Sequence, residues 1–218
     1  MKTIVLTGNI GCGKTSSINS VLVQFDYDTS ISAVGILEDV EGWKWLLAKF
    51  YEDKSAYVYL LQTVIFTHFI KVSEQIEKLR DQKYPPDFVI VERSPIDAKI
   101  IFIENIRHLM TDEEYQALQV TADKVINMYP WNEASYYMLD VPVETCLERT
   151  NRRKREGEDK IDISYLQSLH DLYRNFPGER IPVDPTQHIA LVGEHVRKFI
   201  VEREKPLLTA SQSGRLDS

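Results

Sequence analysis

A glycine-rich stretch near the start of the chain, "GNIGCGKTS" at residues 8–16, constrains the fold more than any other feature. Its spacing is Gly8, four residues, then Gly13, Lys14 and Thr15, and it lies between the apolar "KTIVLT" and a helix-like stretch. A phosphate-binding loop needs this strand–loop–helix context. Glycines let successive N–H groups turn towards phosphate oxygens, and the positive end of the following helix attracts the same anion. The stretch therefore predicts a nucleoside triphosphate site, and a glycine-rich turn without a ligand is the simpler alternative.

Two side chains in this stretch carry the chemistry of a triphosphate site. The Lys14 ammonium can reach the transferred phosphate, and the Thr15 hydroxyl can coordinate Mg²⁺. We therefore expect a nucleoside triphosphate and Mg²⁺ as ligands and regard Lys14 as a candidate catalytic residue. The residues expected around the triphosphate are Gly8, Asn9, Ile10, Gly11, Cys12, Gly13, Lys14, Thr15 and Ser16.

Apolar stretches alternate with helix-like stretches along the chain, as in an α/β protein. The all-apolar "FVIVE" reads as a central parallel strand, and the alternation predicts a five-stranded parallel sheet flanked by helices. The expected strands are 2–7, 32–39, 88–92, 135–140 and either 180–184 or 188–192. The expected helices are about 43–51, 54–82, 96–108, 112–128, 143–155, 163–175 and 194–204. We expect one domain over 1–205 and a disordered tail over 206–218.

Composition and charge narrow the range of partners and compartments. The net charge of −7 argues against nucleic acid as a partner, and no apolar run approaches the length of a membrane span. The first strand begins almost at Met1, so a mitochondrial location would require a transit peptide that is missing from this sequence. A disulfide at Cys12 would obstruct the phosphate loop, and Cys146 is the other cysteine. We therefore expect a reducing, cytoplasmic location.

A carboxylate follows the second expected strand, in the stretch "LEDVEGW" at 37–43. Ligands bind at the carboxyl ends of strands in such a sheet, so Glu38 could accept the proton of an attacking hydroxyl, a contribution of about 10²–10⁴-fold. The alternative is that Glu38, Asp39 and Glu41 form a run of acids favoured by the dipole at a helix start. The spacing alone leaves both interpretations open.

Glu92 and Arg93 directly follow the apolar strand at 88–92. An acidic residue at this place commonly holds Mg²⁺ in phosphate-loop folds, and Arg93 could orient the base carboxylate or contact the transferred phosphate. The alternative is a Glu–Arg pair that caps a helix through Ser94 and Pro95. We favour the functional interpretation.

Five of the seven residues from 149 to 155 are basic. Arg149 and Arg153 fall on one face of a helix, and arginines that close over a nucleotide would neutralise charge in the transition state. The alternatives are a solvated helix face and a nucleic-acid patch, the second weakened by the acidic "EGED" that follows. We interpret residues 149–160 as an arginine-rich lid.

Together with further segments, these motifs resemble the deoxyribonucleoside kinases, the family of deoxycytidine and deoxyguanosine kinase, mitochondrial-type thymidine kinase and the broad-range insect enzyme. The matching segments are "GNIGCGKTS", "LEDVEGW", "FYED", "LLQTVIFTHF", "ERSPIDAKIIFIEN", "RTNRRKREGED" and "YLQSLHDLY", in the family's order. The resemblance implies a phosphate-loop kinase fold. It also implies transfer of the γ-phosphate of ATP to the 5′-hydroxyl of a deoxynucleoside, a step of nucleotide salvage. Family members are usually dimers, so a homodimer through the helices near 54–82 and 96–108 is expected.

The resemblance implies roles for residues near the transferred phosphate. Glu38 matches the family's general base on the 5′-hydroxyl, and Arg93 matches the arginine that pairs near that base. Glu92 and Thr15 match the Mg²⁺ positions.

The resemblance also implies a nucleoside site. Gln62 matches the glutamine that reads a base edge through two hydrogen bonds, and Trp43 and Phe102 match aromatic residues that pack around the base. Tyr51 and Glu158 match the pair that holds the sugar 3′-hydroxyl.

On the donor side, Arg149, Arg153 and Arg155 match the lid arginines of the family. Arg149 is expected to stack on the adenine of the phosphate donor. The final strand and the adenine loop match poorly, so "DPTQ" at 184–187 is only a candidate donor-base loop.

The sequence departs from the family pattern beside two of these motifs. Leu37 and Asp39 flank Glu38, where the family usually has Thr or Ser and Pro. Pro95 and Asp97 stand where the family often has Ile or Leu and Ser.

Ile65, Phe69 and Ala98 take the positions that decide between bases in the family. Cytidine-selective members carry an acidic residue in place of Ala98 and pair it with an arginine, a pair that this chain lacks. Ile65 and Phe69 should narrow the slot against purines, whereas Gln62 can turn its amide to suit either pyrimidine. We expect thymidine as the best substrate, deoxycytidine next and purine deoxynucleosides poor, unless Asp97 turns its carboxylate towards the base.

Two other functions remain as alternatives. A nucleoside monophosphate kinase would need basic residues around its charged acceptor, and the segment 38–70 holds only Lys44, Lys49 and Lys54. A regulatory nucleotide binder without catalysis would need no base-reading glutamine beside an aromatic wall.

Overall fold

The computed structural model describes residues 1–27, 30–155 and 158–213. Its strands form one parallel sheet in the order β2-β3-β1-β4-β5, which confirms the predicted five-stranded sheet. The strands are β1 (Lys2–Thr7), β2 (Ala33–Ile36), β3 (Phe88–Glu92), β4 (Ser135–Asp140) and β5 (Glu179–Pro182).

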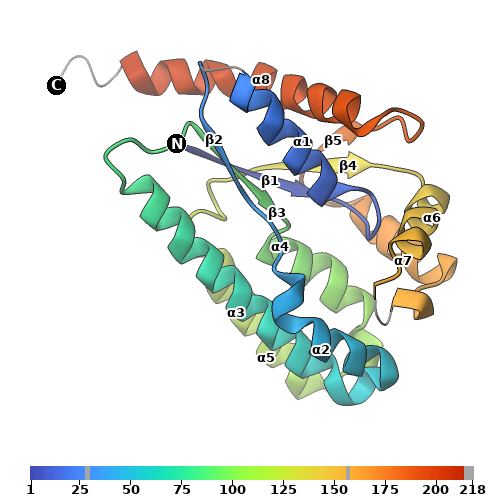
Figure 1. The fold of residues 1–218 in the computed structure, drawn as a ribbon. Coiled ribbons are helices and arrows are strands. Elements are labelled where there is room, and N and C mark those ends of the chain that lie inside the picture. The colour runs from blue at the N-terminus through green and yellow to red at the C-terminus, as the bar shows by residue number, and fades with distance from the viewer. Residues whose placement is uncertain (28–29, 156–157, 214–218) are drawn as a thin grey trace.

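Helices cover both faces of this sheet, as Figure 1 shows. They are α1 (Lys14–Tyr27), α2 (Val40–Glu52), α3 (Lys54–Arg80), α4 (Pro95–Asp97), the π-helix η1 (Ala98–Ile103), the 3₁₀ helix η2 (Arg107–Leu109), α5 (Asp112–Ile126), α6 (Val143–Arg153), the 3₁₀ helix η3 (Glu158–Lys160), α7 (Ile163–Tyr173) and α8 (Ile189–Ser213). In Figure 1, α1 and α8 lie above the sheet, and α3 and α5 lie below it. A parallel sheet covered by helices on both faces is the α/β architecture that the sequence predicted.

The central strand β1 and its neighbour β3 are the most deeply buried strands of the sheet. Ile4, Val5 and Leu6 of β1 have no exposed surface, because helices pack on both sides of them. In the register of β1 and β3, Leu6 lies beside Glu92. The segments that follow these strands therefore leave the sheet side by side, at its carboxyl edge.

The sequence left two positions open for the fifth strand, 180–184 or 188–192, and the structure supports the first. β5 spans Glu179–Pro182 and pairs with β4, whereas residues 189–192 begin helix α8. Val192, Val196 and Ile200 are buried along one side of α8, four residues apart. That spacing is typical of a helix and was the signal against a strand at 188–192.

Two expected helices differ from the structure. The helix expected at 96–108 is divided into α4, η1 and η2. The closing helix continues beyond residue 204 to Ser213, so residues 206–213 of the expected tail are helical. The rest of that tail lies outside the described residues.

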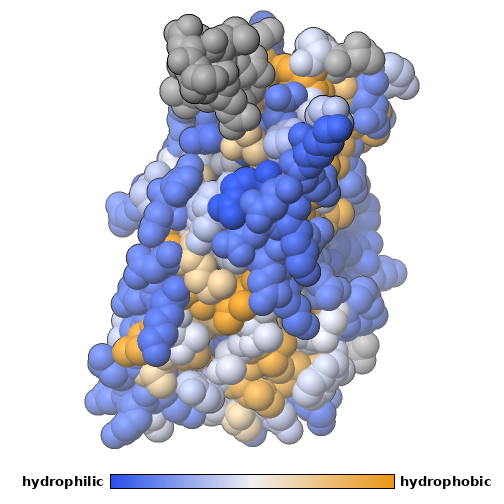
Figure 2. Space-filling model, turned by 90° about the vertical axis from the view of Figure 1, so that its left-hand side faces the viewer, coloured by the Kyte–Doolittle hydropathy of each residue, from blue (hydrophilic) through white to orange (hydrophobic). Residues whose placement is uncertain are grey.

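No helix among the described residues is long and apolar enough to cross a membrane. Figure 2 shows the side of the molecule that lies to the left in Figure 1. Hydrophilic side chains predominate there, and hydrophobic ones gather in a strip between two hydrophilic ridges and towards the lower end.

Candidate active site

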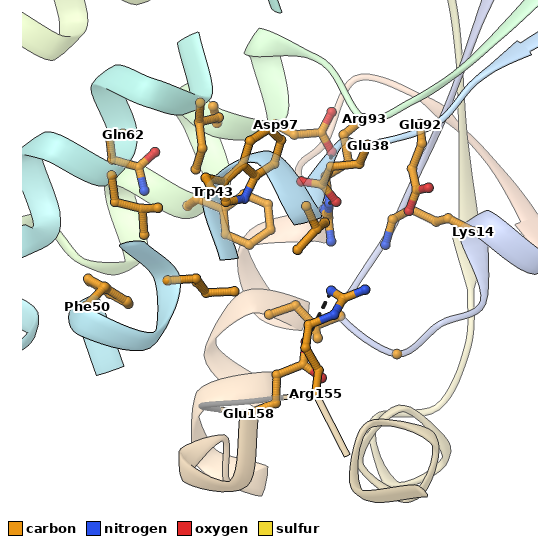
Figure 3. A pocket seen from close by; sticks show the side chains of 18 of the residues that line it. Lys14, Glu38, Trp43, Phe50, Gln62, Glu92, Arg93, Asp97, Arg155 and Glu158 are labelled. Carbon is orange, nitrogen blue, oxygen red and sulfur yellow. Dashed lines mark hydrogen bonds and ion pairs between the residues drawn. The ribbon is translucent and has the colours of Figure 1, made fainter. Parts of the chain in front are cut away.

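A cavity of about 220 Å³ lies beside the phosphate loop. Most of the predicted site residues line it, although they come from segments far apart in the sequence. They are Ile10, Gly11, Lys14, Thr15, Glu38, Trp43, Tyr51, Gln62, Ile65, Phe69, Glu92, Arg93, Ala98, Phe102, Arg153, Arg155 and Glu158. Figure 3 shows Gln62 and Phe50 at one end of the cavity and Glu92 and Lys14 at the other. The predicted residues that do not line it are Gly8, Asn9, Cys12, Gly13, Ser16 and Arg149.

The loop between β1 and α1 has the backbone of a phosphate cradle. Gly8 and Gly11 have φ angles of +137° and +77°, which side chains rarely tolerate. A Cβ on Gly11 would also lie 2.2 Å from the carbonyl oxygen of Cys146. The loop therefore depends on glycine both for its backbone angles and for its close contact with α6.

Lys14 is buried at the floor of this loop. Its Nζ donates hydrogen bonds to the carbonyl oxygens of Asn9, at 3.0 Å, and Gly8, at 3.4 Å. The ammonium is thus held against the loop, where the phosphates of a nucleotide would lie.

The Thr15 hydroxyl and the Glu92 carboxylate meet at the end of the cavity. Thr15 Oγ1 lies 2.8 and 3.0 Å from the two carboxylate oxygens. Hydroxyl and carboxylate oxygens are the hard ligands that Mg²⁺ prefers, and Mg²⁺ usually takes only one or two protein ligands besides phosphates and water. Across the described residues, no group of three or more His, Cys, Asp or Glu side chains could hold a metal ion. The Thr15–Glu92 pair therefore fits an ion that is bound together with a nucleotide.

Glu38 follows β2 and turns into the cavity. Its Oε2 lies 3.5 Å from Nε of Arg93. The start of α2 is capped by Asp39, whose side chain accepts a hydrogen bond from the Gly42 N–H. Asp39 therefore provides the cap of α2, and the Glu38 carboxylate pairs with Arg93.

Arg93 is buried directly after β3 in a backbone conformation with φ of +65°. Its Nη1 donates to the Gly8 carbonyl oxygen at 3.1 Å, and its guanidinium lies over the Phe102 ring at 4.6 Å. Burial by itself lowers the pKa of Arg93, but Tyr173 and Glu38 are among the neighbours that raise its pKa overall. A strained, buried arginine of this kind is typical of functional sites.

The sequence also allowed this segment to cap a helix through Ser94 and Pro95, and the structure confirms a cap at Ser94. Ser94 caps α4 by accepting a hydrogen bond from the Asp97 N–H, and Pro95 occupies the first turn. The cap and the cavity-lining pair are therefore adjacent features of one segment.

The far end of the cavity is apolar, with one amide. Gln62 is buried, and within the described part of the chain its Oε1 has no hydrogen-bond partner. Trp43 and Phe69 are buried in the wall, and Trp131 packs edge-on behind Phe69 at 5.7 Å between ring centroids. An unpartnered buried amide oxygen costs free energy unless a ligand bonds to it.

The predicted lid residues surround Glu158. Arg153 donates to Glu158 through Nε at 3.0 Å and through Nη2 at 2.5 Å, and Arg155 Nη1 lies 3.4 Å from the same carboxylate. Burial, then Tyr165 and Glu158, raises the pKa of Tyr51. Residues 156 and 157 of the expected lid lie outside the described residues.

Arg149 lies on the other side of the phosphate loop. Its Nη1 donates to the Cys12 carbonyl oxygen at 3.0 Å, and its Nη2 lies 3.5 Å from the carbonyl oxygen of Pro185. The structure thus brings Arg149 next to the candidate adenine loop at 184–187.

Cys12 and Cys146 are both free and buried.

Several cavity residues were not singled out from the sequence. They are Val40, Leu47, Phe50, Leu61, Ile106 and Tyr165, whereas Leu37 and Asp97, which also line the cavity, were noted in the sequence as departures from the family pattern. Leu47 and Phe50 follow Trp43 at helical spacing, so the helical period could have predicted that they line the cavity on the same side as Trp43. The carboxylate of Asp97 does not turn to the base end, because it accepts hydrogen bonds from Ser94 Oγ, at 2.7 Å, and the Tyr173 hydroxyl, at 2.9 Å.

Known proteins resemble this chain over most of its length. A thymidine kinase of ictalurid herpesvirus 1 is 28% identical over 174 residues, which cover 76% of this chain and 70% of the relative. Human mitochondrial thymidine kinase 2 is 28% identical over 204 residues, which cover 90% of this chain and 73% of that relative. A putative deoxynucleoside kinase of frog virus 3 is 23% identical over 185 residues, covering 80% and 82%.

A solved structure shares the fold. The deoxyadenosine kinase of M. mycoides, solved with dCMP and dCDP, superposes with a TM-score of 0.71 at 16% identity, covering 92% of this chain and 99% of that one. The sequence model of the deoxynucleoside kinases matches residues 4–210. Together with the phosphate loop and the cavity beside it, this match shows that the chain belongs to the deoxynucleoside kinase family.

Proposed function

We propose that this deoxynucleoside kinase transfers the γ-phosphate of ATP to the 5′-hydroxyl of a pyrimidine deoxynucleoside, with thymidine preferred and deoxycytidine next. The observation that carries the proposal is the buried Oε1 of Gln62, which has no hydrogen-bond partner among the described residues and lies at the opposite end of the cavity from Lys14. A nucleoside with its base at Gln62 would direct its 5′-hydroxyl towards Glu38 and the phosphate loop.

In this proposal Glu38 accepts the proton of the 5′-hydroxyl as the oxygen attacks phosphorus. Arg93, whose Nε lies 3.5 Å from the Glu38 carboxylate, holds that carboxylate aimed at the hydroxyl. Lys14 and the loop N–H groups stabilise the charge on the phosphate oxygens. Thr15 and Glu92 would hold Mg²⁺, which supplies positive charge to the phosphates of the donor.

The wall around Gln62 supports a pyrimidine. Ala98 brings no charge to the base, and Phe69 is buried against Trp131, so its ring has little room to move aside. Ile65 adds bulk on the same side of the cavity. These side chains leave little space for the second ring of a purine.

The sugar and the donor have candidate sites of their own. Tyr51 and Glu158 both line the cavity, and we propose that they bind the 3′-hydroxyl. Arg153 and Arg155 would belong to a lid over the phosphates. Arg149 would stack on the adenine of ATP, since it lies next to Pro185.

A monophosphate acceptor suits the cavity less well. The cavity-lining residues between 37 and 69, all within the described ranges, include no basic side chain. A charged acceptor would lose its hydration there without gaining a counter-charge.

We also propose a homodimer. The sequence led us to expect a contact through helices near 54–82 and 96–108, but the second of these is divided into α4, η1 and η2, so we propose a contact through α3 and α5. These helices pack together and expose Leu60 and Val120. Sedimentation velocity of the protein and of a Leu60→Glu, Val120→Glu variant tests this assembly. A wild-type protein that sediments as a monomer would refute it.

A turnover assay tests the proposed reaction. The protein is supplied with saturating ATP and Mg²⁺ and with each of the four deoxynucleosides, or with thymidine monophosphate. We expect conversion of thymidine and deoxycytidine to their monophosphates and little reaction of thymidine monophosphate. Faster turnover of the monophosphate than of any nucleoside would contradict the proposal.

A further inference from the structure

We infer that Tyr173 and Asp97 are positioning residues, which hold the guanidinium of Arg93 in place between the phosphate loop and Glu38. The inference rests on the proposed role of Arg93 and deepens it. It concerns side chains to which the sequence analysis assigned no such role.

The three side chains form a buried chain of hydrogen bonds. Arg93 Nη1 donates to the Tyr173 hydroxyl at 2.8 Å, and that hydroxyl donates to Asp97 Oδ1 at 2.9 Å. Tyr173 and Asp97 are 2% and 0% exposed, so water does not compete for these bonds. The same Nη1 atom also donates to the Gly8 carbonyl oxygen at 3.1 Å, which ties the network to the phosphate loop.

Asp97 is held as a counter-charge for Arg93. Its Oδ1 lies 4.0 Å from Arg93 Nη1 and also accepts a hydrogen bond from Thr7, while Ser94 donates to its Oδ2. A buried cation without a counter-charge is costly, and a buried carboxylate needs several donors. Burial and the charge of Asp97 raise the pKa of Tyr173, so its hydroxyl keeps the proton that it donates.

This network fixes one end of the Arg93 guanidinium, and Glu38 lies at the other. Nη1 is bound by Tyr173 and Gly8, whereas Nε faces the Glu38 carboxylate at 3.5 Å. The left-handed backbone of Arg93 is strained, so the residue relies on its surroundings to keep this pose. Loss of the Tyr173 hydroxyl should let the guanidinium shift and misalign Glu38.

The Tyr173 ring and its hydroxyl have separable roles. The ring packs with Ile101, Met138 and Phe176 in a small apolar cluster, and Tyr173→Phe retains this packing. The matched control is Tyr137→Phe, because the buried Tyr137 hydroxyl also donates to a carboxylate, Glu204 Oε1 at 2.6 Å, but belongs to a strand–α8 contact away from the cavity.

The test is a double-mutant cycle with saturating ATP and thymidine. For Tyr173→Phe we expect kcat to fall about tenfold, as when one hydrogen bond to a charged group is lost. We expect less than about a twofold change in the thymidine dissociation constant, since only the transition state needs the aligned base. Asp97→Asn keeps the shape of the side chain and removes its charge. It should likewise lower kcat with little change in the thymidine dissociation constant. Tyr137→Phe should keep wild-type kcat.

The cycle then separates the two proposals. In an Arg93→Ala background, Tyr173→Phe should cause no further loss of kcat, because it acts through Arg93. Wild-type kcat of Tyr173→Phe and Asp97→Asn, or losses that multiply in the double variant, would overturn the positioning role alone. Wild-type kcat of Arg93→Ala would overturn the positioning role together with the proposed role of Arg93.

Discussion

The carboxylate of Glu38 and the guanidinium of Arg93 meet at 3.5 Å, although 55 positions separate the two residues in the sequence. The sheet register explains the meeting. Ile36 of β2 pairs with Val91 of β3, and Glu38 and Arg93 each lie two residues further along. The pairing of two strands thus brings the proposed base and its partner to the same place.

Glu38→Gln tests the proposed base. We expect kcat to fall by about 10²-fold or more with a smaller change in nucleoside binding, because a general base acts mainly in the transition state. The matched control is Asp39→Asn, which removes the neighbouring charge but keeps a good cap on α2. If KM rises and kcat stays level in Glu38→Gln, then Glu38 binds substrate and the base lies elsewhere.

Lys14→Ala should abolish most turnover in a protein that remains folded. Removal of one fixed donor that stabilises developing negative charge costs about 10²–10³-fold in kcat, and we expect at least such a loss for the Lys14 ammonium. Thermal melting by circular dichroism checks the fold. The control is Lys44→Ala, since the half-buried Lys44 makes an i,i+3 ion pair with Glu41 at the surface of α2. Near-wild-type turnover of folded Lys14→Ala would refute the phosphate-loop interpretation.

The sequence predicted the local structure well where a feature depends on neighbouring residues. The loop at 8–16 and the strand before it are one continuous segment, so spacing was enough to predict them. The Arg93–Tyr173–Asp97 network could not be predicted in this way, because Tyr173 lies 80 and 76 residues from its two partners. Such contacts depend on how α7 packs against η1, which no local pattern encodes.

The break in the helix expected at 96–108 has the same explanation. A regular helix was expected there from the local sequence, but the segment is divided into α4, η1 and η2. A π-helix is rare and often accompanies a functional site, and η1 carries Ala98 and Phe102 into the cavity wall. Tertiary packing has overridden local preference at this point.

Glu158→Ala should penalise deoxynucleosides more than their 3′-deoxy analogues. A hydrogen bond to a carboxylate contributes about 1.5–3 kcal/mol, so we expect at least a tenfold larger loss of kcat/KM for the natural acceptor. The variant also releases Arg153 and Arg155, but that effect is common to both acceptors. Tyr51→Phe, which removes only a hydroxyl, should show the same selectivity. Equal losses on both acceptors would exclude Glu158 from the sugar site.

His68 should make stability depend on pH below neutrality. Burial is the main cause that lowers the pKa of His68, beside the Trp43 ring at 4.9 Å. The unfolded chain, with a histidine pKa of about 6.5, then binds a proton more readily than the folded one. The contribution of neutral His68 is complete above that value and decreases as the pH falls through it.

Urea unfolding at several pH values measures this effect. The free energy of unfolding should fall more steeply between pH 7 and pH 5 in the wild type than in His68→Gln. The exposed His108 provides the control, as His108→Gln should keep the wild-type slope. Identical slopes for the wild type and His68→Gln would contradict the prediction.

The last prediction concerns the choice of base. The Gln62 amide can present either its oxygen or its nitrogen to a pyrimidine edge, so it distinguishes thymine from cytosine only weakly. Without a charged pair at Ala98 and Phe69, none of the described wall residues specifically binds the exocyclic amine of cytosine or excludes the methyl group of thymine. A purine meets the Phe69 ring, which Trp131 supports from behind. Each poorly accommodated methylene-sized group costs about 1–3 kcal/mol, so we expect a preference of about 10–200-fold and not complete exclusion.

Thymidine should therefore have the highest kcat/KM, deoxycytidine should follow, and deoxyguanosine should be poor. Phe69→Ala should widen the slot and raise the ratio of deoxyguanosine to thymidine turnover. A wild-type protein that prefers deoxyguanosine, or a ratio unchanged by Phe69→Ala, would mean that another part of the wall selects the base.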